Sequence, residues 1–280
     1  MISLDRGGID FFATASINNF PFFDGRRLAL VEGPDGAAAV WNGGAFLRAG
    51  RYGPAPSELA ELVEERLGLR ENYGEFLVRI PNDPIRRMDL LRGWRMRSFP
   101  LWLVLLITIN QQNAGFVQGW HNLWCIIKQE RPVKLGDFAT YIPPELEEVL
   151  RSSELLKRRK VGYRAEHIFS AVRSIVENEN PLRARGVGEY TKRIVGLLAR
   201  RKYGEPPVDR RVKVVVRKAY RVDDAERFLR RGSGEWASLA VAVALDAVPP
   251  SCALERIRRG QMRPVEGASP ANLWRLSPFC

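Results

Sequence analysis

The segment Leu182-Arg-Ala-Arg-Gly-Val-Gly-Glu-Tyr-Thr-Lys192 places two glycines, Gly186 and Gly188, directly before a helical pattern. Glycine permits a tight turn because it has no Cβ. The backbone N–H groups of such a turn point outward at the positive end of the next helix, which suits a phosphate. Gly-x-Gly alone is a weak signal, because many helix connections contain it. Basic residues surround this turn and strengthen the prediction of an anion site: Arg183, Arg185, Lys192 and Arg193.

The charge distribution also indicates a polyanionic partner. The 280 residues carry 44 Lys and Arg against 32 Asp and Glu, a net charge of +12. Residues 151–231 alone contain 23 basic and 10 acidic residues, so this stretch holds the whole excess. An ion-paired thermophilic surface would balance its signs. Nucleic acid is the commonest partner of such a segment. An anionic lipid is the weaker alternative, since no basic amphipathic helix with an exposed apolar stripe is evident.

Hydropathy points away from a membrane protein. The longest apolar run, residues 99–109, is about eleven residues and too short to span a bilayer. The N-terminus shows no charged stretch leading into an apolar block with a cleavage site, so we expect no signal peptide. The sequence therefore predicts an intracellular protein of the cytoplasm or nucleoid, from a thermophilic prokaryote or archaeon, with no membrane partner.

The chain has too few metal-binding side chains for a zinc or iron–sulfur site. Its three cysteines, Cys125, Cys252 and Cys280, are widely separated, and its only histidines are His121 and His167. We expect both histidines to be packing or surface residues. A pairing of Cys252 with Cys280 stays open, because hyperthermophiles do form intracellular disulfides.

The expected fold is mainly α, a helical bundle with a helix–hairpin–helix motif, preceded by a small antiparallel β-sheet. Residues 1–50 read as strands, with turns at Gly33-Pro-Asp-Gly36 and Asn42-Gly-Gly44. A helix follows from Pro56 to about Leu69. We expect a β-rich N-terminal domain over 1–85, a helical domain over 86–260 with the hairpin motif at about 175–220, and a tail over 261–280. Helices are predicted near 84–91 and over 100–108, 113–127, 144–152, 163–177, 191–202, 210–219, 223–230 and 235–247.

A single acidic residue stands out in the basic segment. Asp209 lies nineteen residues after Tyr190, in Pro206-Pro-Val-Asp-Arg210, where a helix should begin. Its default role is that of a helix N-cap. Gly186-Val-Gly188 followed by Val208-Asp209, however, resembles the helix–hairpin–helix superfamily of DNA glycosylases.

Further stretches fit that resemblance in the same order. They are Ile9–Thr14 with Asn18–Phe22, Arg92–Arg95, Ile107–Asn113 and Gly162-Tyr-Arg-Ala165. The resemblance covers most of residues 9–247. In layout it is closest to the 8-oxoguanine and 3-methyladenine glycosylase branches, without an iron–sulfur cluster. Two departures are a shortened segment before the hairpin and Arg185 at a position where proline is usual.

The resemblance implies a base-excision enzyme and a set of site residues. Such an enzyme extrudes a damaged or mismatched base from duplex DNA and hydrolyses its N-glycosidic bond. Asp209 would be the catalytic carboxylate, and Gln111 or Gln112 would fill the gap in the base stack, although packing is the alternative role for both glutamines. Contacts to DNA would come from Arg185, Gly186, Val187, Gly188, Lys192 and Arg210.

Tyr190 stands where bifunctional members carry a lysine that forms a Schiff base with the sugar. A phenol cannot do that chemistry, so the resemblance implies a monofunctional enzyme. Lys192 keeps a bifunctional glycosylase/lyase open, although it projects about 200° away from Tyr190 around a helix.

The sequence leaves open alternatives for the function of the protein and for its ligands. A non-catalytic helix–hairpin–helix DNA-binding protein stays open, whereas an RNA-processing factor is disfavoured because no single-strand stacking platform is evident. The sequence does not identify the excised base. We expect a monomer that binds damaged double-stranded DNA and requires no cofactor, with a structural monovalent cation at the hairpin carbonyls left open.

Overall fold

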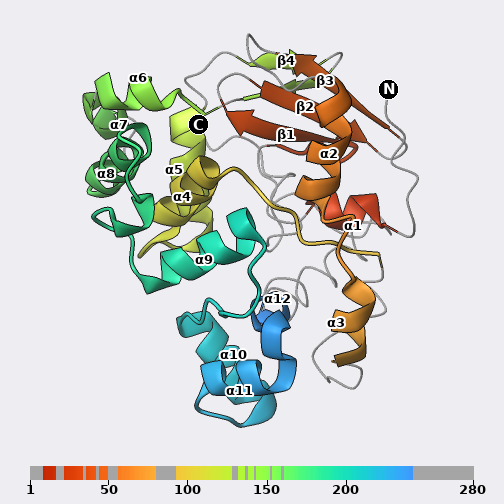
Figure 1. Ribbon diagram of the computed structural model, residues 1–280. Coiled ribbons are helices and arrows are strands. Elements are labelled where there is room, and N and C mark those ends of the chain that lie inside the picture. Colours follow the sequence, from red (N-terminus) through yellow and green to blue (C-terminus); the bar gives the residue numbers. More distant parts are fainter. Residues whose placement is uncertain are drawn as a thin grey trace.

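The computed structural model describes residues 9–16, 22–33, 36–41, 44–49, 56–79, 93–127, 132–135, 138–141, 143–151, 153–158 and 161–241. A sheet with flanking helices forms one part of the molecule, and helices form the rest (Figure 1). The fold is therefore mainly α with a small antiparallel β part, as the sequence predicts. The proposed boundary near residue 85, the helix expected at 84–91, Cys252, Cys280 and the tail lie outside the described residues.

The predicted meander is confirmed. Strands β1 (Arg27–Gly33), β2 (Gly36–Trp41) and β3 (Gly44–Ala49) pair antiparallel in the order β1-β2-β3. Alternate side chains of β1 enter different cores, because neighbouring residues of a strand point to opposite faces. Leu28 and Leu30 pack with helix α2 (Pro56–Leu67), whereas Ala29 and Val31 pack toward the helical part.

The expectation that residues 1–50 are all strands is wrong at one place. Phe11–Ser16 forms helix α1, which Asp10 caps through a hydrogen bond from the Ala13 N–H at 2.8 Å. An Asp at the N-cap accepts a hydrogen bond from a backbone N–H of the first helical turn, which favours a helix over a strand at this place. Phe11 and Ala15 then pack in the core that covers the sheet.

Helix α4 (Leu101–Gln111) is the centre of the larger helical core. It is buried all round, as its unbroken apolar sequence predicts. Helices α5 (Phe116–Ile127) and α8 (Arg164–Val176) pack against it, and α6 (Leu146–Arg151) and α7 (Ser153–Arg158) pack against α8. The hairpin of β4 (Val133–Leu135) and β5 (Phe138–Thr140) was not predicted, because three-residue strands are too short to show a period. Helix α7, which has six residues, was not predicted either.

Helix α9 (Glu189–Arg200) joins two cores. Val195 packs in the core of α4, whereas Leu197 packs in a second core with α10 (Arg210–Tyr220), α11 (Ala225–Ser233) and α12 (Ala237–Val241). The helix expected at 235–247 begins instead as a 3₁₀ turn, η2 (Gly234–Trp236), and α12 ends at the last described residue. Helix α3 (Tyr73–Arg79), which was not predicted, packs against the second core.

The C-terminal end of α9 is fixed by a half-buried ion pair. Arg201 ends the helix in the left-handed region and donates to both carboxylate oxygens of Glu71, at 2.6 and 2.7 Å. The Tyr203 hydroxyl donates to the same carboxylate at 2.7 Å. Burial raises the pKa of Tyr203, so its phenol stays protonated as a donor. This cluster ties α9 to the segment between α2 and α3.

Candidate nucleic-acid interface

The glycine turn predicted from the sequence precedes α9. A short 3₁₀ turn, η1 (Pro181–Arg183), comes first, and the Asn180 side chain accepts a hydrogen bond from the Leu182 N–H at 3.1 Å. Gly186 then adopts φ 86°, a conformation that disfavours side chains. A Cβ there would collide with the ring of His167. Only glycine fits this position, for both reasons.

Gly188 has a different role in the same turn. It is the N-cap of α9 at φ −85° and ψ 178°, and no side chain caps the helix there. A Cβ on Gly188 would meet nothing within 4 Å. The first N–H groups of a helix lack partners inside the helix. The open space in front of Gly188 therefore exposes the positive end of α9 to a ligand.

Side chains from two other elements hold the turn in place. Gln112 Nε2 donates to the Gly186 carbonyl at 2.7 Å and to Thr191 Oγ1 at 3.1 Å. The Arg185 N–H donates to Ser170 Oγ on α8 at 3.1 Å. The turn is thus built from main chain but supported on both sides, with buried Val187 beneath it.

The connection between α4 and α5 docks beside the hairpin. The Gln112 carbonyl accepts hydrogen bonds from Arg164 Nε at 3.1 Å and from the Tyr163 hydroxyl at 3.4 Å. Asn113 adopts φ 49° and is exposed, and its Nδ2 donates to the Tyr163 hydroxyl at 3.3 Å. Tyr163 itself is 50% exposed. Gln111 is directed back into the protein, because its side chain fills the space beside Gly119.

Asn113 in this connection and Tyr163 at the start of α8 are thus exposed side by side, and neither was predicted as a site residue. A signal for Asn113 was present, since Asn followed by Ala-Gly between two helical patterns favours a left-handed turn residue. Tyr163 lies in Gly162-Tyr-Arg-Ala165, a stretch that fits the family resemblance, but nothing in that pattern assigned Tyr163 itself a role at DNA.

Asp209 is the N-cap of α10. Its Oδ1 accepts a hydrogen bond from the Val212 N–H at 2.7 Å, and its backbone is extended. Within the described part of the chain, Oδ2 accepts no hydrogen bond. The side chain is half-buried, so one carboxylate oxygen is held by its own helix and the other is available to a ligand.

Arg193 connects the two helix N-termini. Its guanidinium donates to the Pro206 carbonyl, three residues before Asp209, at 3.1 Å and to Glu226 at 2.7 Å. Pro206 and Pro207 are buried, which stiffens the approach to α10. The structure therefore ties the hairpin helix to the segment that carries the predicted catalytic carboxylate.

The remaining predicted site residues lie on or beside the first turns of α9 and α10. Tyr190 is 40% exposed. Lys192 pairs with Glu189, and hydrogen bonding to its ammonium lowers the pKa of the Glu189 carboxyl. Arg185 is exposed and forms an ion pair with Glu166 at 3.2 Å, and Arg210 is exposed next to Asp209.

The capacity of this region for metal ions is limited. Among the described residues, no group of three or more His, Cys, Asp or Glu could hold a metal ion. The hairpin carbonyls of Ala184 and Gly186 each accept one hydrogen bond, and each has a second lone pair that a monovalent cation can use. Separately, no helix in the described ranges is long and apolar enough to cross a membrane.

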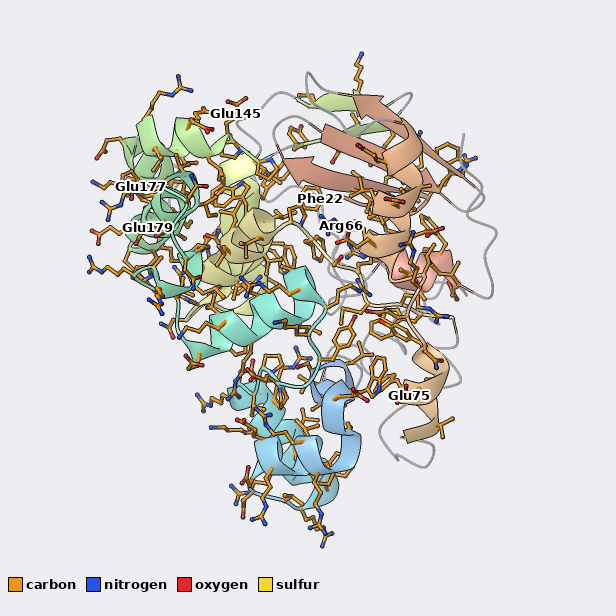
Figure 2. All side chains as sticks on the ribbon, in the orientation of Figure 1. Phe22, Arg66, Glu75, Glu145, Glu177 and Glu179 are labelled. Carbon is orange, nitrogen blue, oxygen red and sulfur yellow. The ribbon has the colours of Figure 1, made fainter. Side chains whose placement is uncertain are left out.

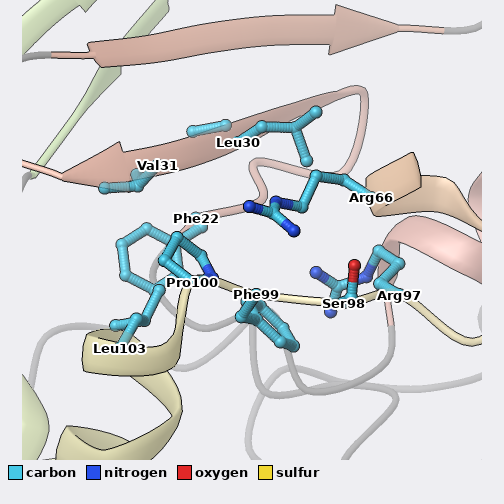
Figure 3. Close-up of a pocket in the computed structure, with 10 residues that line it drawn as sticks. Phe22, Leu30, Val31, Arg66, Arg97, Ser98, Phe99, Pro100 and Leu103 are labelled. Carbon is cyan, nitrogen blue, oxygen red and sulfur yellow. The ribbon is translucent and has the colours of Figure 1, made fainter. Parts of the chain in front are cut away.

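A small cavity lies between β1 and the segment before α4, and none of its lining residues belongs to the hairpin (Figure 3). Its volume of about 10 Å³ suits one water molecule and not a base. Arg66 and Arg97 point into it (Figure 3). Arg97 is buried beneath Phe99 and donates to the Thr14 carbonyl at 2.9 Å, and burial lowers the pKa of Arg97 to about 9. This cavity belongs to the packing of sheet on helices.

No protein-family model matches the sequence, and a search of curated proteins finds no match either. Solved structures do resemble the chain. MBOgg1 in complex with a low-affinity DNA ligand superposes with a TM-score of 0.68 at 17% identity, over 86% of this chain and 90% of that chain. The 3-methyladenine DNA glycosylase from Archaeoglobus fulgidus has a TM-score of 0.67 at 19% identity, over 88% and 97%.

A third structure is the 8-oxoguanine glycosylase/lyase of Clostridium acetobutylicum in complex with double-stranded DNA containing cytosine opposite 8-oxoG. It has a TM-score of 0.62 at 16% identity, over 84% of this chain and 86% of that chain. The chain therefore has the fold of the 8-oxoguanine and 3-methyladenine DNA glycosylases, which confirms the architecture that the sequence resemblance predicted.

Proposed function

We propose that this protein is a base-excision DNA glycosylase that extrudes a damaged or mismatched base and hydrolyses its N-glycosidic bond without cleaving the strand. One observation carries the proposal. The hairpin N-terminus of α9 is open to an anion, and the α10 N-terminus, tied to it through Arg193, presents Asp209 with a free carboxylate oxygen. The cap of α10 needs only one oxygen of Asp209, and a binder of phosphate alone gains nothing from a second, free carboxylate oxygen beside the phosphate. The fold, shared with DNA glycosylases that were solved with DNA, supports the same assignment.

Binding begins at the DNA backbone. A phosphate in front of Gly188 meets the positive end of α9 and the surrounding arginines. Contacts to phosphate fix position without reading sequence. A monovalent cation at the hairpin carbonyls, which we include in the proposal, would add positive charge to the same turn.

Extrusion of a base leaves a gap in the stack. Gln111 and Gln112 remain the candidates predicted from the sequence, but Gln112 is held by Gly186 and Thr191 and would have to leave them. Asn113 is exposed at the tip of the same connection and reaches DNA without breaking those contacts. We therefore add Asn113 to the candidates for the gap-filling residue.

Bond cleavage places positive charge on the sugar, as in other glycoside hydrolyses. The Asp209 carboxylate stabilises that charge and orients a water molecule toward the anomeric carbon. The C–N bond electrons leave with the base, the water oxygen bonds to the sugar carbon, and the water proton is released. Tyr190 offers no amine, so the product is an intact abasic site.

The main competing function is that of a bifunctional glycosylase/lyase that uses Lys192. One of the similar structures is a glycosylase/lyase, so the fold is compatible with both activities. A non-catalytic DNA-binding protein is the second competing function, and Asp209 argues against it.

A panel of duplex oligonucleotides tests the function. Each duplex carries one lesion: 8-oxoguanine, an alkylated purine, or uracil or thymine opposite guanine. We expect base release from at least one of them, seen as strand cleavage only after alkali. Tight duplex binding without release from any member would instead favour a non-catalytic DNA-binding protein.

A further inference from the structure

One face of α10 carries three basic side chains and one exposed valine, Val214. Arg210, Lys213 and Arg217 follow one another at spacings of three and four, which places them on the same side of the helix. All three are exposed. The opposite side carries Val212 and Val216, 4% and 1% exposed, in the second helical core. The basic face therefore points away from the core.

Among the residues that the structure describes, the charges on this face are mostly without an ion-pair partner. Arg210 and Lys213 form no ion pair with the described residues. Arg217 pairs with Asp223 at 3.3 Å, but the two side chains are 75% and 88% exposed. Such an exposed pair contributes little and can exchange its partner for another anion. Residues 210–221 contain no acidic side chain, whereas an ordinary solvated helix face mixes both signs.

The position of the basic face relates it to the candidate site. It begins next to Asp209 and continues along α10, away from the hairpin, in the lobe formed by α10 and α11 (Figure 1). Side chains that end in nitrogen project outward from this lobe (Figure 2). Eleven helical residues extend about 16 Å, and phosphates of one strand advance about 3.4 Å along the DNA axis. The face is long enough to contact several phosphates.

We propose that the exposed face of α10 is a second phosphate-binding surface, which holds the duplex backbone that flanks the excised base. Lys213 and Arg217 contact phosphates that the hairpin does not reach. The partner is duplex DNA and not an acidic protein, because the face continues directly from Asp209. This inference rests on the proposed function for the place of the lesion, but the contacts themselves require no catalysis.

The test measures how duplex affinity depends on salt. The double variant Lys213→Gln/Arg217→Gln removes two charges from the face and leaves Asp209, Arg210 and the hairpin intact. Binding to an undamaged duplex should show a slope of log affinity against log salt that is shallower by about 1.8, since each phosphate contact contributes about 0.9. Lys213→Gln alone should reduce the slope by about half as much.

The matched control removes the same charge elsewhere. Arg26→Gln/Arg70→Gln changes two exposed arginines outside α10, one directly before β1 and the other in the turn after α2. Its slope should equal that of the wild type. Equal losses in both double variants, or no loss in either, would overturn the second surface. Because the duplex is undamaged, this test does not depend on catalysis. If the protein releases no base but the salt slope falls only in the α10 variants, the glycosylase function is refuted and the second phosphate-binding surface is supported.

Discussion

The two ends of α9 differ in how they satisfy their backbone and their charges. At the C-terminal end, Arg201 caps the helix and its guanidinium is held by both oxygens of Glu71. At the N-terminal end, no side chain caps the helix, and a Cβ on Gly188 would meet only open space. The C-terminal end is thus held by contacts within the protein, whereas the N-terminal end has room for a ligand. We therefore expect substitutions at the two ends of α9 to affect different properties, protein stability at the C-terminal end and DNA binding at the N-terminal end.

The largest effect should come from the carboxylate beside the open end. Asp209→Asn should lower the rate of base release by at least about 100-fold, because the charge opposite the developing cation is lost. Binding of damaged duplex should change little, since Asn caps a helix as well as Asp does. Single-turnover release and duplex binding measure the two quantities.

A matched control exists on the next helix. Asp224 caps α11 in the same way, with its Oδ1 accepting from the Arg227 N–H at 3.0 Å. Asp224→Asn should release base at the wild-type rate. Wild-type release by Asp209→Asn would remove Asp209 from the mechanism.

The ion pair at the C-terminal end of α9 should instead affect the stability of the protein. Glu71→Gln leaves the Arg201 guanidinium half-buried without its charge partner, and we expect the free energy of unfolding to fall by about 2 kcal/mol. The salt dependence of duplex binding, measured well below the melting temperature, should not change. Chemical denaturation followed by circular dichroism gives the stability.

Glu177→Gln is the control for this substitution, because Glu177 pairs with Arg173 on an exposed surface. Its effect should stay below about 1 kcal/mol. If Glu71→Gln were as mild as Glu177→Gln, the ion pair would not be what fixes the C-terminal end of α9.

Substitutions of the two hairpin glycines, Gly186 and Gly188, should have different effects: one should reduce stability and the other should reduce DNA binding. Gly188→Glu should weaken binding to every duplex by about tenfold, a loss of about 1.4 kcal/mol, because it adds a negative charge where the proposed function places a phosphate. It should leave stability unchanged, since a side chain there meets open space. Gly188→Gln, of the same size but uncharged, should lose less affinity.

Gly186→Ala should behave in the opposite way. Its φ of 86° strains any side chain, and the new methyl group would collide with the His167 ring. We expect a loss of about 2 kcal/mol in the free energy of unfolding. An unchanged melting temperature would show that the turn relaxes and that Gly186 is not required by geometry.

Local sequence patterns predicted the elements whose signals are local. The glycine turn, the Asp209 cap, the meander and the buried helix α4 each depend on neighbouring residues. Contacts between distant residues were not predictable in this way. Gln112 meets Gly186 across 74 positions, and Arg201 meets Glu71 across 130.

Contacts between distant residues also explain why the prediction of the site residues was incomplete. Pattern and resemblance placed Gln111 and Gln112 at the DNA, but only the folded chain shows that Gly119 and the hairpin engage them. Asn113 was missed because its exposure depends on where α5 begins, three residues later than the apolar spacing indicated.

The smallest expected effect concerns strand cleavage: Lys192→Gln should not change it. Tyr190 lies on the first turn of α9 and carries no amine, while Lys192 projects about 200° around the helix from it and pairs with Glu189. Borohydride added during turnover should therefore trap no covalent adduct with DNA in the wild type or in Lys192→Gln. Tyr190→Lys is the positive control, because it supplies an amine at the position that the proposed function places against the sugar, and it should give an adduct. A strong wild-type adduct that disappears in Lys192→Gln would show that Lys192 leaves Glu189 to attack the sugar, which makes the enzyme bifunctional and keeps the glycosylase assignment.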